Sequence, residues 1–269
     1  DLAALALGGC LLSPGKFAAS LDLRRDGRFS FTYSGEITML ALSKLASAKT
    51  AREDRFTPAP CPIDGSTDRQ QPCSEKAIAE QRKRWEDGRE ARAASRAREA
   101  ESMKAMLGGV DPADPRTVDE LVARLRQQAG WRKVEYKGDG LFLVDFALSG
   151  VLGHDFRFPT MERLAMANSF VEASLRGDGT VRVDAPGFNA AAAGGPYRAL
   201  IQMAAMEKAG QSPADLPQIE GTFTITTDGE ILSNNTETGP TATTAGRGLD
   251  WRIDTRTAAA PMAIIRLKP

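Results

Sequence analysis

The sequence has few histidines and cysteines, residue types that many catalytic and metal-binding sites use. It contains one histidine and three cysteines among 269 residues, and its 35 basic and 35 acidic side chains leave no net charge. A single histidine excludes a multi-histidine metal site, and the lack of a basic excess argues against a nucleic-acid partner. The chain has neither a GxSxG motif nor a P-loop. We therefore expect a protein that is not an enzyme and that holds no cofactor and no metal.

The apolar stretch at residues 1–12, DLAALALGGCLL, is too short to cross a bilayer, which takes about 20 residues. It resembles the end of a signal peptide that lacks its start, and LGGC at residues 7–10 resembles a bacterial lipobox. In that motif the cysteine receives the lipid and becomes the mature N-terminus, so Cys10 is the predicted lipidation site. Leu11 follows it rather than Asp, which by resemblance to enterobacterial lipoproteins favours the outer over the inner membrane. The alternative is a buried strand with a core cysteine.

With Cys10 assigned to the anchor, two cysteines remain, Cys61 and Cys73. An even remainder in an exported protein favours a disulfide, here closing a proline-rich loop. Such a bond contributes about 3 kcal/mol in the chain-entropy model. A zinc site would need two further ligands, and no histidine lies nearby. We predict a disulfide between Cys61 and Cys73.

Alternating apolar and polar residues along several segments are typical of half-buried strands. Asp-Gly pairs, which favour tight hairpin turns, stand between such segments at 26/27, 139/140, 178/179 and 228/229. A Ser-Pro-Gly turn is expected at residues 13–15, before the first strand. The last run, residues 262–267, is apolar on both faces and is predicted to be a central strand. The expected fold class is α+β, built on a twisted antiparallel β-sheet meander.

The longest helical pattern is strongly charged. Ser74 is a suitable N-cap for a helix that runs to Gly108-Gly109, and residues 74–104 carry nine basic and seven acidic side chains. The heptad pattern fails after Trp85, so a coiled coil is not expected. The pattern predicts one long, mostly solvated helical insertion.

Two further helices are expected to pack on one face of the sheet. The first begins at a capping box, Thr117 to Glu120, and ends at Gly130. The second spans residues 197–209. Residues 160–173 fit neither the helical nor the strand period cleanly, and we favour a strand because the segment lies among hairpins.

Two side chains are weighed as catalytic or ligand-fixing groups. Asp145 lies on the second face of a strand whose first face is apolar, where a carboxyl pKa could be raised. A carboxylate that faces solvent or pairs with an arginine is the more ordinary interpretation. His154 precedes Asp155, but neighbours in a strand point to opposite faces, which favours a surface histidine. Neither residue is assigned a catalytic role.

The C-terminal strands resemble those of a known family. GTFTITTDGEILSNN, LDWRIDT and PMAIIRL, within residues 220–267, are similar to the end of LppM-type bacterial lipoproteins, with Asp228, Gly229, Asn234 and Trp251 at matching positions. The resemblance implies a lipid-anchored α+β domain that associates with envelope lipid or glycolipid and has no catalytic residues. The charged helix and the cysteine-bracketed loop depart from the family pattern. Trp251 is expected in the core with its N–H bonded to a carbonyl, and the alternative is a rim position that stacks on sugar.

These features predict a non-catalytic binding or structural module of the bacterial cell envelope, held on the periplasmic side by a lipid on Cys10. An apolar cleft between sheet and helices is the expected place for a lipid. The first alternative is an envelope assembly factor that recruits a protein partner through the charged helix at 74–108, and the second is an envelope hydrolase around His154 or Asp145. The expected organisation is a signal-peptide remnant and lipobox at 1–12 and a single α+β domain at 13–269, in which 43–130 form a disulfide-bracketed loop and helical insertion.

Overall fold

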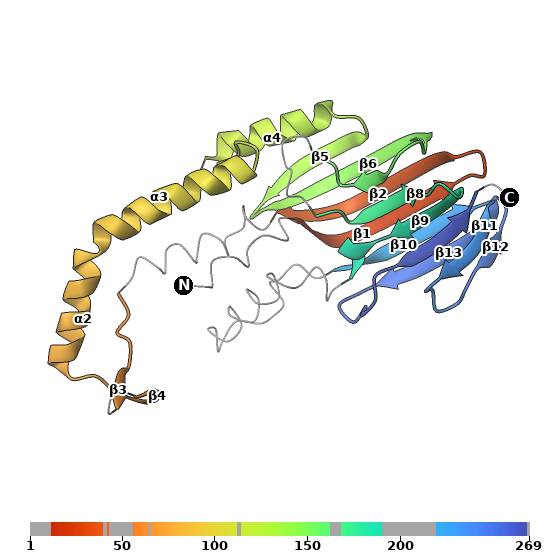
Figure 1. The fold of residues 1–269 in the computed structure, drawn as a ribbon. Coiled ribbons are helices and arrows are strands. Elements are labelled where there is room, and N and C mark those ends of the chain that lie inside the picture. The colour runs from red at the N-terminus through yellow and green to blue at the C-terminus, as the bar shows by residue number, and fades with distance from the viewer. Residues whose placement is uncertain are drawn as a thin grey trace.

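The computed structural model describes residues 12–39, 42, 56–63, 66–111, 114–161, 168–189 and 219–267. Within these ranges the chain is α+β, as predicted, with two β-sheets, a two-stranded ribbon and three α-helices (Figure 1). Cys10 and the predicted helix at 197–209 lie outside the described residues.

The larger sheet has seven strands in the order β12-β13-β10-β1-β2-β6-β5. Their bounds are β12 (Thr241–Thr243), β13 (Gly246–Ile253), β10 (Glu220–Thr227), β1 (Leu12–Leu23), β2 (Arg28–Met39), β6 (Leu141–Val151) and β5 (Trp131–Gly138). Neighbours are antiparallel except β1 and β10, which run parallel, with Leu21 opposite Ile225. The predicted all-antiparallel meander is therefore wrong at this pair. Alternation identifies strands but not their neighbours, and β10 returns to β1 only after the chain has built most of the second sheet.

The second sheet has five antiparallel strands in the order β11-β14-β9-β8-β7. They are β11 (Glu230–Asn234), β14 (Met262–Arg266), β9 (Thr180–Asp184), β8 (Val171–Leu175) and β7 (Phe156–Phe158). The inner position predicted for residues 262–267 is confirmed, because β14 lies between β11 and β9. Of residues 160–173, the described part is irregular at 160, 161 and 168–170 and a strand from Val171, so the favoured strand is confirmed only at its end.

Three of the four Asp-Gly pairs form the predicted hairpin turns, between β1 and β2, β5 and β6, and β8 and β9. The fourth, Asp228-Gly229, leads from β10 in the larger sheet to β11 in the smaller one, so it joins two sheets. The turn predicted at 13–15 is wrong. Those residues belong to β1, where a register shift between Pro14 and Phe17 accommodates the proline. β1 also begins at Leu12, inside the predicted leader.

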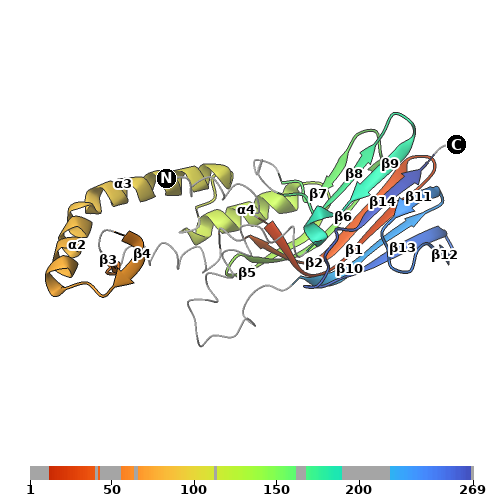
Figure 2. The same ribbon diagram turned by 60° about the horizontal axis from the view of Figure 1, so that its bottom comes forward.

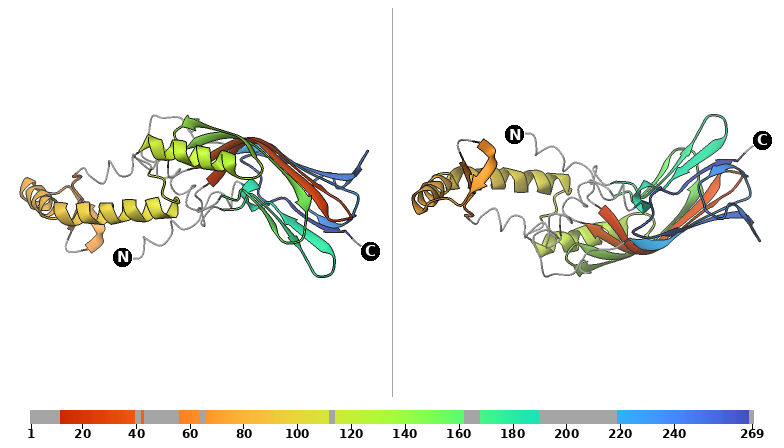
Figure 3. Two further views of the ribbon diagram at one scale, coloured as in Figure 1. Left: turned by 90° about the horizontal axis from the view of Figure 1, so that it is seen from above. Right: turned by 90° about the horizontal axis from the view of Figure 1, so that it is seen from below.

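The two sheets stack as two layers (Figure 2, Figure 3). Between them lie aromatic rings from both layers. Phe31 of β2 lies 5.0 Å from Phe158 of β7, and Phe223 of β10 lies 5.4 Å from Phe188 in a 3₁₀ turn, η3 (Pro186–Phe188), measured between ring centroids. All four side chains are fully buried. Because such rings each bury about 150–250 Å², they dominate the packing that holds the layers together.

Helix α4 (Pro115–Gln127) covers one end of the larger sheet (Figure 1). Its buried stripe is the predicted one: Val118, Leu121, Val122 and Leu125. The predicted capping box is wrong, because the N-cap is Asp114, whose carboxylate accepts a hydrogen bond from the Arg116 amide at 3.0 Å. Asp114 is a strong N-cap and Pro115 suits the first helical position, so the helix starts before Thr117. The Thr117 hydroxyl instead accepts a bond from the Asp111 amide at 2.9 Å.

The predicted single helix from 74 to 108 is two helices, α2 (Glu75–Asp87) and α3 (Arg89–Met106), which meet at Gly88. Glycine is a poor helix former, which explains the break. The predicted start is confirmed, since the Ser74 hydroxyl accepts a bond from the Ala77 amide at 3.3 Å. The two helices and the ribbon β3 (Cys61–Ile63)–β4 (Ser66–Gln71) form an arm that projects from the sheets (Figure 1). No residue of α2 is buried.

Candidate functional site

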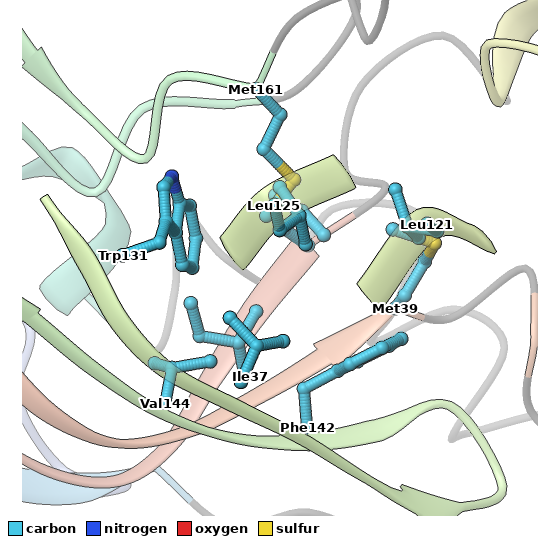
Figure 4. A pocket seen from close by; sticks show the side chains of 10 residues that line it. Ile37, Met39, Leu121, Leu125, Trp131, Phe142, Val144 and Met161 are labelled. Atoms are coloured by element: carbon cyan, nitrogen blue, oxygen red, sulfur yellow. The ribbon is translucent and has the colours of Figure 1, made fainter. Parts of the chain in front are cut away.

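A space lined only by apolar side chains lies between α4 and the larger sheet (Figure 4). We call it the apolar crevice. Its lining comes from β1, β2, α4, β5, β6 and the segment after β7: Leu12, Ile37, Met39, Leu121, Leu125, Trp131, Val134, Phe142, Val144 and Met161. All ten are buried. The void among them is about 10 Å³, the lower limit for one water molecule, so the crevice is closed in this structure.

Local periodicity places most of these side chains. Leu121 and Leu125 are four residues apart and share one face of α4, whereas Phe142 and Val144 are two apart and share one face of β6. In Figure 4 the two leucines face Ile37, Val144 and Phe142, Trp131 lies to one side, and Met161 extends toward Leu125. The crevice is thus built between a helix and the sheet end that it covers.

Helix α4 forms one wall of the crevice, and its side-chain hydrogen bonds to neighbouring elements come from its C-terminal half. The Arg126 guanidinium donates two hydrogen bonds to the Val134 carbonyl of the edge strand β5, at 3.1 and 2.6 Å. Arg124 donates one to the Gly108 carbonyl at 3.3 Å. Opening the crevice therefore means separating α4 from one edge strand, while the ladder hydrogen bonds of the inner strands stay in place.

Ionisable groups do not contribute to the crevice, since none of its ten residues titrates. The Tyr33 side chain is buried in the core, and its hydroxyl donates a hydrogen bond to the Glu36 carbonyl at 2.7 Å. Burial raises the pKa of this hydroxyl well above its ordinary value, so it stays protonated. No group of three or more His, Cys, Asp or Glu side chains is arranged to hold a metal in the part of the chain that the structure describes.

The two weighed side chains do not come together. His154 is exposed in the connection between β6 and β7, in line with the surface interpretation. Asp145 is half-buried in β6, opposite Ser34 of β2 and Lys133 of β5. Six strand residues separate Asp145 from the end of β6, a span of about 20 Å. The geometry of these residues gives no support to an acid–base pair.

Cys61 and Cys73 form the predicted disulfide, with their Cα atoms 5.1 Å apart. Contacts beside it join the ribbon to α2. The Gln81 side chain exchanges two hydrogen bonds with the Ala59 backbone, at 2.9 and 3.0 Å. Phe56 meets Trp85 edge to face at 6.0 Å, and the Arg82 guanidinium lies 5.0 Å from the Phe56 ring centroid. The described residues near the tip of the arm are therefore held by a disulfide and side-chain contacts although they lie outside the core.

The four residues at positions matched to LppM-type proteins have structural roles in or next to the sheets. Trp251 is buried as predicted, and its indole N–H donates to Asn235 Oδ1 at 3.0 Å. Asn234 instead accepts bonds from Thr236. Asp228 accepts a bond from the Arg25 amide at 2.8 Å. A Cβ at Gly229 would lie 2.7 Å from the Arg266 carbonyl oxygen, so the position has no room for a side chain.

Sequence reasoning missed several residues of the crevice. Met161 and Leu12 lie far from α4 in the chain and reach it only through the fold. The lipobox interpretation places Leu12 in the leader. The alternation from Phe17 to Leu23 falls on odd positions and does not extend back to Leu12, because a register shift lies between Pro14 and Phe17.

No helix of the described residues is long and apolar enough to cross a membrane. No protein-family model matches the chain, and no curated protein sequence matches it. The structure is similar to the NMR structure of the folded domain of LppM from Mycobacterium tuberculosis. The match covers 99% of this chain and 95% of that chain, at 13% sequence identity and a TM-score of 0.31.

Proposed function

We propose that this protein is a non-catalytic lipoprotein of the bacterial cell envelope that binds an acyl chain of an envelope lipid in the apolar crevice. The lipobox at Cys10 and the disulfide support export and anchoring on the periplasmic side, and Leu11 favours the outer membrane. The observation that carries the proposal is the lining itself, ten buried side chains that carry no charge and no polar group other than the indole N–H of Trp131. A polar ligand would lose its hydrogen bonds there, whereas an acyl chain has none to lose.

Binding requires α4 to move, because the closed crevice has room for about one water molecule. The movement separates the leucines of α4 from the sheet and breaks the bonds between Arg126 and Val134. Each methylene that enters from water contributes about 0.8 kcal/mol, so a chain taken up from water gains about 8 kcal/mol from ten methylenes. That is more than the loss of two partly exposed hydrogen bonds, at about 1 kcal/mol each, and the chain replaces the apolar contacts of the two leucines.

The test is native mass spectrometry of the Cys10→Ser variant. This variant is exported by the expressing cell and purified from an envelope fraction. We expect a co-purifying mass of a lipid. Leu125→Gln places an amide in the lining and should remove that mass, whereas Ala123→Gln, on the exposed side of the same helix, should keep it. Circular dichroism establishes that both variants are folded. A clean protein mass at good yield from the parent chain would count against the proposal.

A second candidate function, recruitment of an envelope protein, is supported by the arm. The disulfide, the hydrogen bonds of Gln81 and the Phe56–Trp85 contact join α2 to the chain around the ribbon, although α2 buries no residue. Ordering a surface before binding lowers the entropy cost of association, which is what a docking element needs. Replacing residues 76–104 with a short Gly/Ser linker leaves the buried Leu107 and Val110 in place. A lipid binder then keeps its lipid, and a recruitment factor loses its partner.

A further inference from the structure

We propose that the apolar crevice takes acyl chains only from the membrane in which Cys10 is anchored. The proposal rests on the proposed function and on lipidation at Cys10. Its structural basis is Leu12, which is the first residue of β1 and also lines the crevice. Leu12 is 1% exposed, and its amide donates a hydrogen bond to Asn168 Oδ1 at 3.2 Å. The folded domain is therefore already fixed at residue 12.

Two peptide steps separate the Cα atoms of Cys10 and Leu12. Since an extended chain spans at most about 3.6 Å per residue, these atoms lie within about 7 Å of each other. A lipid on Cys10 holds that residue at the bilayer surface. Leu12, and with it the crevice, must then lie at the same surface. A flexible tether of 20 residues would instead allow a separation of about 25 Å.

The short connection determines which lipids can reach the crevice. An acyl chain of the anchoring leaflet starts beside the crevice and can enter with little exposure to water. An acyl chain from another membrane must cross water, which exposed methylenes strongly oppose. The occupant is thus a lipid of the anchoring leaflet, and the protein acts on the membrane that holds it.

The experiment uses Trp131, which lines the crevice, as the reporter. Of the three tryptophans in the chain, Trp85 and Trp251 are replaced by Phe. The chain from Cys10 onward is coupled through the Cys10 thiol to a maleimide lipid in phosphatidylcholine vesicles, since Cys61 and Cys73 are bonded to each other. Phosphatidylcholine with brominated acyl chains, which quench tryptophan on contact, is placed either in the anchoring vesicles or in a second vesicle population.

We expect Trp131 emission to fall at least twofold when the brominated lipid is in the anchoring vesicles and to stay unchanged when it is only in the second population. A 20-residue Gly/Ser insertion between Cys10 and Leu11 should weaken this quenching, because the crevice is then free to lie away from the bilayer surface. A matched chain that keeps Trp251 alone, buried between the sheets, should show no quenching in either case. Equal quenching from both vesicle populations, or quenching by the anchoring vesicles that the insertion leaves unchanged, overturns the proposal.

A separate measurement distinguishes this failure from failure of the proposed function. Brominated palmitate in solution is titrated into the unanchored chain. Quenching of Trp131 there, together with no preference in vesicles, contradicts only the restriction to the anchoring membrane. If palmitate leaves Trp131 unquenched and anchored vesicles do the same, acyl-chain binding in the crevice is wrong as well.

Discussion

Asn235 Oδ1 accepts a hydrogen bond from the Trp251 indole at 3.0 Å and a second from the Met262 amide at 2.8 Å. Trp251 belongs to β13 of the larger sheet, and Met262 begins β14 of the smaller one. The other end of the same amide donates to the Ala260 carbonyl at 2.8 Å. One side chain therefore links the two layers at the edge of the core.

Asn235→Ala should lower the free energy of unfolding by about 1–2 kcal/mol, because it leaves the Trp251 N–H without its acceptor. Asn235→Asp keeps the acceptor oxygen and should cost less. Urea denaturation measures both, and the Trp251→Phe background provides the control. If the Asn235→Ala loss is as large in that background as in the parent chain, the two residues are not coupled.

This link also shows how far the sequence could predict the fold. Burial of Trp251 follows from its alternation with Leu249 and Ile253, and a carbonyl partner for its N–H was expected. The sequence does not identify the partner, Asn235, which is the neighbour of the matched position Asn234. β11 carries a register shift between Ile231 and Ser233, and Asn235 lies one residue beyond the strand. Next to a register shift and beyond the end of a strand, the two-residue strand period cannot indicate which asparagine side chain points toward Trp251.

The Asp-Gly turns show the same division between local and non-local information. Turn formation depends on a few adjacent residues, and the pairs at 26/27, 139/140 and 178/179 connect paired strands as predicted. Whether the strands on either side pair with each other depends on the rest of the chain, and those around Asp228-Gly229 do not. The apolar crevice likewise depends on non-local information, because Leu12 and Met161 meet α4 only through the tertiary fold.

Gly130→Ala should destabilise the protein more than Gly109→Ala does. Both glycines have positive φ, +91° and +93°, so each alanine costs about 1–2 kcal/mol in backbone energy. At Gly130 a Cβ would also lie 2.5 Å from the Phe146 ring, whereas at Gly109 nothing lies within 4 Å. Crowding a buried ring adds about 1–3 kcal/mol. Urea denaturation gives the difference, and equal losses would mean that the Phe146 ring moves aside freely.

Replacing Cys61 and Cys73 together with serine should loosen the arm and leave the sheets unchanged. The bond closes a loop with a sequence separation of 12, which contributes about 3 kcal/mol in the chain-entropy model. We expect faster hydrogen exchange in residues 56–87 and unchanged exchange in the inner strands. Cys10→Ser, which leaves the disulfide intact, is the control. Unchanged exchange at 56–87 in the double variant would show that Gln81 and the Phe56–Trp85 contact suffice to order the tip.

Acidification should release the N-terminus of α4, the helix that covers the apolar crevice. Side-chain hydrogen bonds from Arg116, and then its backbone amide, hold the pKa of Asp114 below its ordinary value of 3.8. Because the pKa is lower in the folded state, the stabilisation from this carboxylate is complete above about pH 4. It is lost as the pH falls through the lowered pKa of the folded protein.

NMR chemical shifts of the α4 amides, followed from pH 5 to pH 2, measure this effect locally. Asp114→Asn retains a side-chain oxygen that can cap the helix but does not titrate, so the first-turn amides should lose their transition in this window. Asp178→Asn is the matched control. It removes another carboxylate with a lowered pKa, which bonds Thr180 in the turn between β8 and β9. That variant should leave the α4 transition in place, and a transition that persists in Asp114→Asn would assign the acid sensitivity of the helix to a different group.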